Sequence, residues 1–163
     1  METGILSLLT SKDDRQACAL ADRIIAESRE SDKWYDGIED FAELLESPKS
    51  LVRNRALHIL AANARWDEQD RFDAILPGCL ARLGDEKPIT VRQCVKALAE
   101  IGRSKPRYIP VILDALIRAD FSGYADSMRP LIERDVAAVI GELTRLVGRD
   151  GRNDGCNSEN LNV

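Results

Sequence analysis

The sequence lacks the features that mark a secreted or membrane-spanning protein. Its start, METGILSLLTSKDD, has no basic segment before a short apolar run, so we expect no signal peptide. No stretch approaches the roughly 20 apolar residues of a membrane span. The four cysteines are scattered, and no two of them have C-x-x-C spacing. These absences favour a cytoplasmic protein with free thiols and no membrane partner.

Residues that build catalytic and metal centres are also scarce. His58 is the only histidine, which gives a metal site or a Cys–His dyad little basis. The chain has no phosphate-binding glycine loop, no dinucleotide fingerprint and no G-x-S-x-G turn. We therefore expect no enzyme activity and no cofactor or metal. His58 is expected at an ordinary surface or groove position, and Cys79 and Cys94 as small buried apolar residues.

The charge balance is acidic overall but uneven. The net charge of −5 argues against sequence-independent binding of nucleic acid, which depends on neutralising phosphates. Residues 31–50 hold six acids and two bases, whereas residues 51–110 hold eleven bases and seven acids. The basic middle is either an ordinary solvated surface or a local groove for an anionic ligand.

A repeated helical pattern is what the sequence does contain. Around residues 74–103, two segments each place apolar residues three or four positions apart, which is typical of amphipathic helices. Gly84-Asp85 and Lys87-Pro88 separate the two segments. The first segment carries Phe72, Ile75, Leu76, Cys79, Leu80 and Leu83, and the second carries Val91, Val95, Leu98 and Ile101. Because each helix has a single apolar stripe, each must pack on neighbours.

The pattern recurs on both sides. Val52-Arg53 aligns with Val91-Arg92 at a spacing of 92 − 53 = 39 residues, and Arg129 follows Arg92 by 129 − 92 = 37. Two helices in a period near 40 are typical of an α-solenoid. The length of 163 residues predicts one domain. We therefore predict an all-α fold, a right-handed α-solenoid of about three to four helical hairpins.

The central unit resembles the HEAT-repeat family. Leu76-Pro77, Asp85 in the turn, and Val91-Arg92 followed by Ala97-Leu98 are similar to its pattern. The match is weaker over residues 34–65 and looser over 105–147. The chain as a whole is similar to small single-domain bacterial HEAT-repeat proteins, some of which carry names from iron–sulfur cluster assembly. The resemblance implies a stack of hairpins whose second helices line a concave surface.

Capping signals set the expected boundaries. Glu2–Leu9 should form a short helix over the open end of the stack, and Ser11 should cap the helix that follows. Asp32 and Ser47-Pro48 should begin the next two helices. Pro77 is expected inside a helix, residues 120–127 as the longest break, and Ser127 as the cap of the last helix. The solenoid domain should cover residues 1–147, and the glycine- and asparagine-rich residues 148–163 should be a disordered tail.

Arginines that open successive second helices are the first candidates for a site. Arg53, Arg92 and Arg129 should align as a ladder, each paired with an acid in a turn of its own or an adjacent unit, with Asp85 the leading partner. Alternatively, they present donors for a partner's acidic groups, helped by Arg55, Lys96 and Arg103.

Loop residues give the remaining candidates. Trp66 either covers the junction between units or anchors a partner, and Tyr124 invites the same two interpretations. The complete set of partner-binding candidates is Arg53, Arg55, Trp66, Asp67, Lys87, Arg92, Lys96, Tyr124, Asp126, Met128 and Arg129.

Three functions are compatible with the sequence. The first is a non-catalytic interaction or scaffold module that binds a protein or peptide on the concave helical surface. The second is an enzyme acting on nucleic acid, because some HEAT-like folds resemble DNA-alkylation repair glycosylases; Trp66, Asp67 and Tyr124 would be its aromatic and acidic residues. The third is an accessory protein of iron–sulfur assembly, implied only by the resemblance.

Overall fold

The chain folds into helices alone over the residues that the structure describes. The computed structural model describes residues 3–153, with side chains described over 4–148. Eight α-helices and five 3₁₀ segments form, and no strand occurs in residues 3–153. This confirms the all-α class. None of the described helices is long and apolar enough to cross a membrane.

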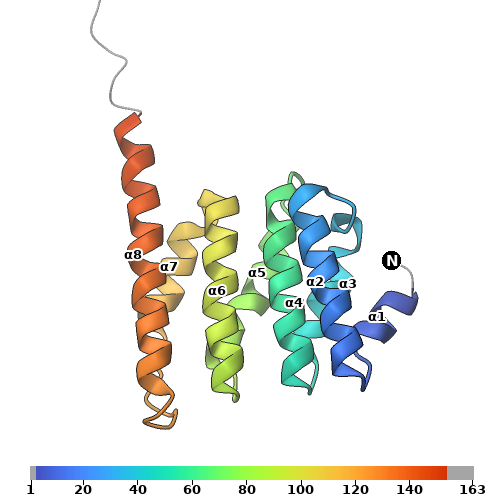
Figure 1. Ribbon diagram of the computed structural model, residues 1–163. Coiled ribbons are helices and arrows are strands. Elements are labelled where there is room, and N and C mark those ends of the chain that lie inside the picture. Colours follow the sequence, from blue (N-terminus) through green and yellow to red (C-terminus); the bar gives the residue numbers. More distant parts are fainter. Residues whose placement is uncertain (1–2, 154–163) are drawn as a thin grey trace, which may run out of the picture.

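Four helices stand side by side in sequence order (Figure 1). They are α2 (Asp14–Glu30), α4 (Ser50–Asn63), α6 (Pro88–Ser104) and α8 (Arg129–Asn153). We call them the long-helix layer. Neighbours within this layer contact each other: α2 packs on α4, α4 on α6, and α6 on α8.

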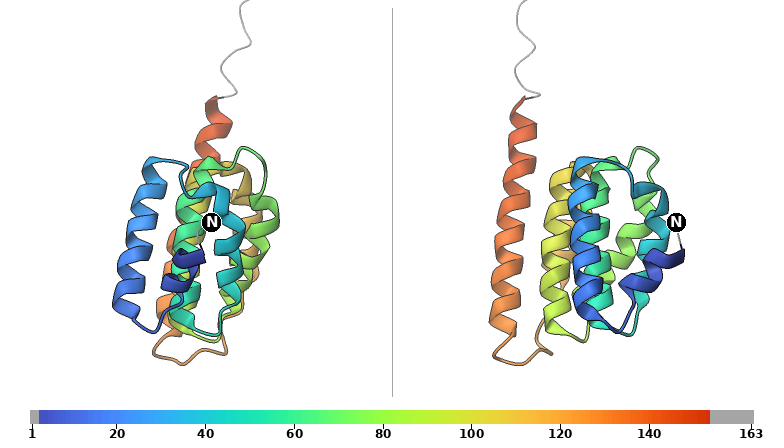
Figure 2. Two further views of the ribbon diagram at one scale, coloured as in Figure 1. Left: turned by 90° about the vertical axis from the view of Figure 1, so that its right-hand side faces the viewer. Right: turned by 45° about the vertical axis from the view of Figure 1, so that its right-hand side comes forward.

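Shorter helices lie behind the long-helix layer, as the turned views show (Figure 2). They are α3 (Ile38–Glu43), α5 (Phe72–Ala81) and α7 (Ile109–Arg118), which contact α4, α6 and α8 respectively. Helix α1 (Thr3–Leu9) lies at the N-terminal end and packs on α2. The 3₁₀ segments Tyr35–Gly37, Leu44–Glu46, Ala64–Trp66, Arg82–Gly84 and Pro106–Tyr108 join or extend these helices.

One continuous core runs between the two rows of helices. Val52, Val91, Phe72 and Leu98 are fully buried, as the apolar stripes predict. Cys79 and Cys94 are also fully buried, which confirms their expected role as core residues. Removing these faces from water is the main stabilising term, because no single helix buries its own stripe.

Several expected helix ends are wrong in detail. Ser11 does not cap α2; Asp13 does, because its carboxylate accepts from Gln16 N at 3.1 Å. Helix α4 begins at Ser50, because Ser47 accepts from Lys49 N at 3.3 Å and so forms a turn rather than a cap. The segment after Asp32 opens as a 3₁₀ turn, and its α-helix starts only at Ile38.

The boundary placed after Val147 is also wrong. Helix α8 continues to Asn153, so backbone that was expected to be disordered is helical over 148–153. Residues 154–163, the rest of the expected tail, lie outside the described residues. Three other expected features hold: Pro77 lies inside α5, α1 forms, and residues 120–127 are non-helical. The expected cap at Ser127 is wrong, because α8 begins at Arg129 and Met128 stands directly before it.

Candidate functional site

The side chain of Arg53 is buried and forms an ion pair within the protein. Its Nε and Nη2 donate to the two carboxylate oxygens of Asp85, each at 2.7 Å, and the side chains are 5% and 2% exposed. The Asp85 hydrogen bond raises the pKa of Arg53. Ser47 O takes a further bond from Nη1 at 2.8 Å. The expected arginine–acid pair is confirmed here, and this guanidinium is turned away from any partner.

The other two arginines do not repeat that arrangement. Arg92 Nε donates to Asp135 Oδ2 at 2.6 Å, so its partner lies on the neighbouring helix α8 and not in a turn as expected. Arg129 pairs with Asp126 at 3.0 Å and more loosely with Glu133 at 3.9 Å. The three arginines open equivalent helices but form three different ion pairs.

Arg55 fastens the N-terminal segment to α4. Its Nη1 donates to Leu9 O at 3.0 Å, and its Nη2 donates to Asp14 Oδ1 at 2.9 Å. Only 5% of the residue is exposed. Arg55 was a partner-binding candidate, and the structure gives its donors to backbone and side chain of the same chain.

Asp67 is the second buried carboxylate of the stack. It is 3% exposed and accepts from Tyr35 Oη at 2.5 Å and from Tyr108 Oη at 3.2 Å. Burial raises the pKa of Tyr108 to about 12 and that of Tyr35 further. Because these tyrosines come from segments before and after Asp67, the carboxylate joins successive parts of the stack.

The side chains of Trp66 and Tyr124 also form hydrogen bonds within the protein. Trp66 Nε1 donates to Ser28 O at 2.6 Å, so this side chain covers the junction between α2 and α4. Tyr124 Oη donates to Asp85 O at 2.6 Å and fixes the 120–127 loop. Of their neighbours, Asp126 is 93% exposed beside Arg129, and Met128 is half-buried.

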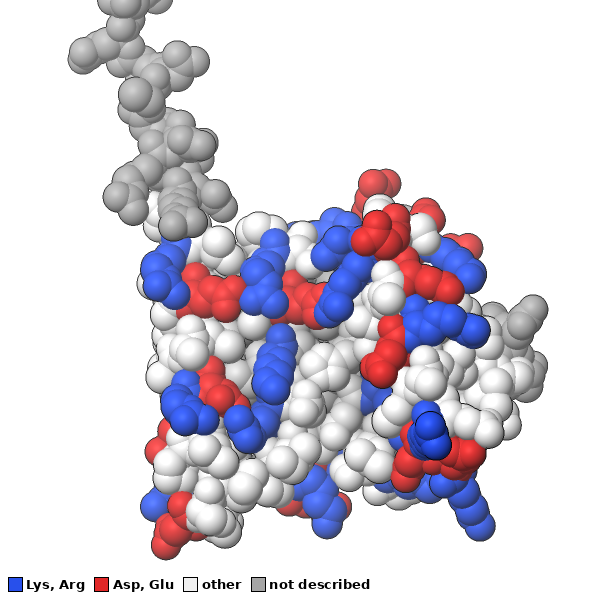
Figure 3. Space-filling view, viewed as in Figure 1, with Lys and Arg blue, Asp and Glu red and all other residues white. Residues whose placement is uncertain are grey.

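The outward surface of α4 and α6 lies in the middle of the long-helix layer. We call it the α4/α6 surface: Leu51, Asn54 and His58 on α4, and Ile89, Gln93 and Lys96 on α6. Each trio has the spacing of one helix face, and His58 Nε2 lies 2.7 Å from Gln93 Oε1 between them. Figure 3 views this layer face on: uncharged side chains occupy much of its middle, bordered by charged side chains of both signs.

The α4/α6 surface exposes large apolar side chains and contains polar groups without partners among the described residues. Leu51 and Ile89 are 46% and 49% exposed although both are large and apolar. Lys96 is exposed and makes no ion pair or hydrogen bond within the described residues. Asn54 Oδ1, in contrast, is a buried atom that accepts no hydrogen bond there. Of the candidates taken from sequence, only Lys96 lies on this surface, with Arg92 at its edge. Lys87 lies just before α6 and pairs with Glu86 at 3.7 Å.

Sequence reasoning missed most of this surface, although one signal was present. Asn54 and Gln93 are 39 residues apart, the period that relates Arg53 to Arg92. Both are carboxamides placed off the apolar stripe, so alignment of polar positions would have paired them. Leu51 and Ile89 gave no such signal, because an apolar residue at a helix start is read as core.

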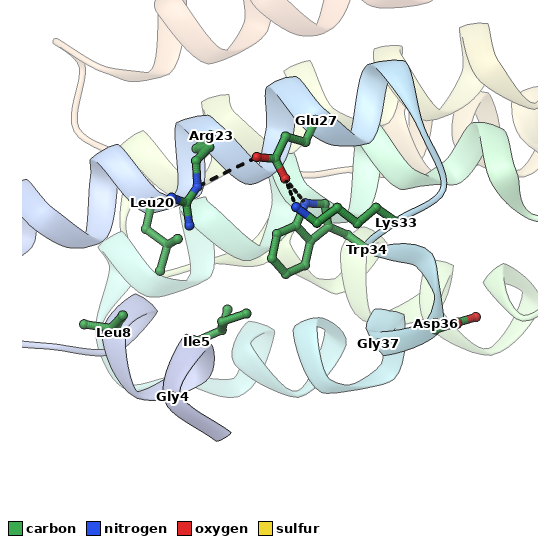
Figure 4. Close-up of a pocket in the computed structure, with 10 residues that line it drawn as sticks. All are labelled: Gly4, Ile5, Leu8, Leu20, Arg23, Glu27, Lys33, Trp34, Asp36 and Gly37. Carbon is green, nitrogen blue, oxygen red and sulfur yellow. Dashed lines mark hydrogen bonds and ion pairs between the residues drawn. The ribbon is translucent and has the colours of Figure 1, made fainter. Parts of the chain in front are cut away.

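A hollow lies at the N-terminal end (Figure 4). This N-terminal end groove has a volume of about 750 Å³, with an apolar wall of Ile5, Leu8, Leu20 and Trp34. Glu27 holds its polar side, accepting from Lys33 Nζ at 2.7 Å and Trp34 Nε1 at 2.9 Å. The hydrogen bond from Lys33 is the main reason that the pKa of Glu27 is lowered.

The described part of the chain offers no cluster of metal ligands, and two of its three cysteines are buried. No three His, Cys, Asp or Glu side chains there are grouped so that they could hold a metal ion. Cys94 Sγ donates to Cys79 O at 3.2 Å, and burial raises the pKa of Cys79 to about 12. A thiol with this pKa is a poor nucleophile and a poor metal ligand.

Comparison with known proteins identifies a similar fold and no family. No family model matches the chain, and no curated protein matches it. An engineered protein, whose crystal structure was determined by the Northeast Structural Genomics Consortium, superimposes with a TM-score of 0.56 at 20% sequence identity. The match covers 86% of this chain and 61% of that chain, so this chain spans about three fifths of its length. The likeness concerns the arrangement of helices alone.

Proposed function

We propose that the chain is a HEAT-like α-solenoid of three to four helical hairpins that binds a protein or peptide on its long-helix layer. The order of α2, α4, α6 and α8 supports the solenoid, as does the pairing of α3, α5 and α7 with the helix that follows each. The α4/α6 surface is the proposed binding site.

This proposal rests on one observation: exposed apolar side chains lie beside a lysine that has no ion-pair partner among the described residues. Leu51 and Ile89 expose apolar area beside Lys96, whereas nearby charges such as Arg92 are already paired. Interfaces of protein complexes combine an apolar centre with a polar or charged rim. A partner segment with an apolar residue for Leu51 and Ile89 and an acid for Lys96 fits this surface.

The alternative functions have less support. The nucleic-acid enzyme needs Trp66, Asp67 and Tyr124 free to contact a base, and each is hydrogen-bonded within the fold. For an iron–sulfur role, Cys79 and Cys94 are fully buried, and Cys18, though exposed, belongs to no group of three metal-binding side chains among the described residues. We therefore propose neither of these functions.

Affinity capture with surface variants tests the proposal. The bait is the full chain carrying Leu51→Glu with Lys96→Glu, compared with the unmodified chain in lysate of its own source. The matched control is Val111→Glu, which changes a 45% exposed apolar residue on α7, behind the long-helix layer. We expect a specific prey that the double variant loses and the control keeps. Prey retained by the double variant would contradict the site.

A further inference from the structure

The far end of the stack carries a groove comparable to the N-terminal one. This C-terminal end groove lies between α7, the loop after it and α8, and has a volume of about 700 Å³. Its apolar wall includes Ile117, Phe121, Ala137 and Ile140, and its charged rim includes Asp120 and Glu133. Ile117 is 68% exposed, the largest exposed fraction among the bulky apolar side chains of the described residues.

The two end grooves complement each other in charge. At the N-terminal end groove, Arg23 is 64% and Lys33 is 58% exposed, and both pair with Glu27, which is 33% exposed. Asp36 also lines that groove but points away from the others (Figure 4). At the C-terminal end groove, Glu133 is 57% exposed and Asp120 is exposed; Arg129, 37% exposed, pairs with Asp126 at 3.0 Å and lies 3.9 Å from Glu133.

Side chains of the two end grooves also lie at matching levels along the axes of α2 and α8. Asn63 donates to Ser28 at 2.9 Å, Gly102 follows Asn63 by 39 residues, and a Cβ on Gly102 would lie 2.8 Å from Leu143. Ser28 and Leu143 therefore stand at one level of α2 and α8. Arg23 lies five residues before Ser28 on α2, and Ala138 lies five residues before Leu143 on α8. The long Arg23 side chain is therefore at the same level as the small, exposed Ala138.

Small side chains on α8 leave space for a neighbouring helix. Ala137, Ala138 and Gly141 are all exposed, and nothing lies within 4 Å of a Cβ built at Gly141. If α2 of another copy stood beside α8 as α6 does, Arg23 would face Ala137 and reach Glu133, one turn earlier on α8. The bulky Leu8 and Leu20 would then meet the apolar wall that contains Ile117.

We propose that copies of this chain associate end to end, with the N-terminal end groove of one copy against the C-terminal end groove of its partner. The contact continues the packing that already joins α2, α4, α6 and α8. Because the two faces differ, each added copy leaves one groove open, and the assembly grows rather than closing as a dimer. This surface is separate from the α4/α6 surface, so either proposal can fail without the other.

Two variants that each lose one face test the proposal. Leu8→Glu places an acid in the N-terminal end groove, and Ala137→Arg fills the C-terminal one and repels Arg23; both residues are exposed, so both variants should fold. Sedimentation equilibrium of the unmodified chain, up to about 1 mM to reach millimolar affinities, should show mass rising with concentration. Each variant alone should remain monomeric, and Val111→Glu should behave as the unmodified chain.

An equimolar mixture of the two variants gives the decisive test. Leu8→Glu retains a C-terminal face and Ala137→Arg retains an N-terminal face, so an equimolar mixture should give a species of twice the monomer mass and nothing larger. A mixture that stays monomeric would overturn the proposal. So would self-association of either variant alone, which indicates like faces, or an unmodified chain that is monomeric throughout the range.

Discussion

Arg53 and Asp85 form a bidentate ion pair of two 2.7 Å hydrogen bonds in the interior of the stack. Asp85 Oδ1 also accepts from Lys87 N at 2.9 Å, at the start of α6, and its backbone carbonyl takes the bond from Tyr124. One residue thus connects α4, the start of α6 and the 120–127 loop. This explains why an acid in the turn and an arginine at the helix start occur together.

Substitution of Asp85 should destabilise the fold strongly. Asp85→Asn removes the charge while the Arg53 guanidinium stays buried, and an uncompensated buried charge costs about 3–5 kcal/mol. Urea denaturation followed by circular dichroism measures the loss. Asp126→Asn is the matched control, because the Asp126 side chain is 93% exposed and its loss should change stability by less than about 0.5 kcal/mol. Equal effects at the two positions would contradict the assigned role of the pair.

Stability should fall in alkaline solution because of the tyrosines around Asp67. Burial raises the pKa of Tyr108 from its ordinary value of 10.0 to about 12 in the folded chain. Below pH 10 the phenol is neutral in both states and its contribution is fully present. Above pH 10 the unfolded state ionises first, so the contribution falls and is lost by about pH 12.

The measurement is the free energy of unfolding across this alkaline range. Tyr35→Phe with Tyr108→Phe should flatten its decline, at the cost of lower stability at neutral pH because Asp67 loses two donors. An unchanged slope in the double variant would assign the decline to other groups.

Gly102 and Gly141 should respond oppositely to alanine. A Cβ at Gly102 would lie 2.8 Å from Leu143 Cδ2 and 3.4 Å from Ile109 Cγ1, so Gly102→Ala should cost about 1–3 kcal/mol through overpacking. At Gly141 nothing lies within 4 Å, and Gly141→Ala should stabilise α8 by about 0.5–1 kcal/mol. Thermal unfolding of both variants checks the signs. A stabilised Gly102→Ala would mean that α6 and α8 are not in close contact there.

Thiol reactivity should separate the cysteines. Cys18 is exposed, whereas Cys79 and Cys94 are buried. In a Cys156→Ser background, a thiol reagent should modify one cysteine rapidly and the other two only when the chain unfolds. Rapid modification of all three in the native protein would contradict the core around Cys79.

The sequence sufficed to predict the helical class because apolar spacing reports directly on which face a helix buries. It also predicted that Asp85 pairs with an arginine at a helix start, because an arginine and an acid recurred at fixed places in the period; which arginine it would be stayed open. It failed at helix starts: Ser11, Asp13 and Ser47 are all competent caps, and only the path of the backbone decides which one accepts from the helix.

The candidate site was harder to predict for a related reason. Arg55, Asp67 and Tyr124 are polar, and polar side chains are normally read as surface. Here each is hydrogen-bonded to a group 32 or more residues away, such as Leu9 O for Arg55. Leu51 and Ile89 show the opposite case, since apolar residues read as core are exposed. In both cases tertiary contacts decide whether the side chain is buried or exposed, and a periodic sequence pattern does not contain these contacts.

Site-specific photo-crosslinking tests the α4/α6 surface most directly. A photoreactive phenylalanine analogue replaces Ile89 on this surface, or Val111 on α7 as the control; the two positions are 49% and 45% exposed. After illumination in cells of the natural source, mass spectrometry identifies the adducts. The account predicts one recurrent partner at position 89, displaced by excess unmodified chain but not by the Lys96→Glu chain, and none at position 111. Adducts at 111 equal to those at 89, or displacement by both competitors alike, would contradict it.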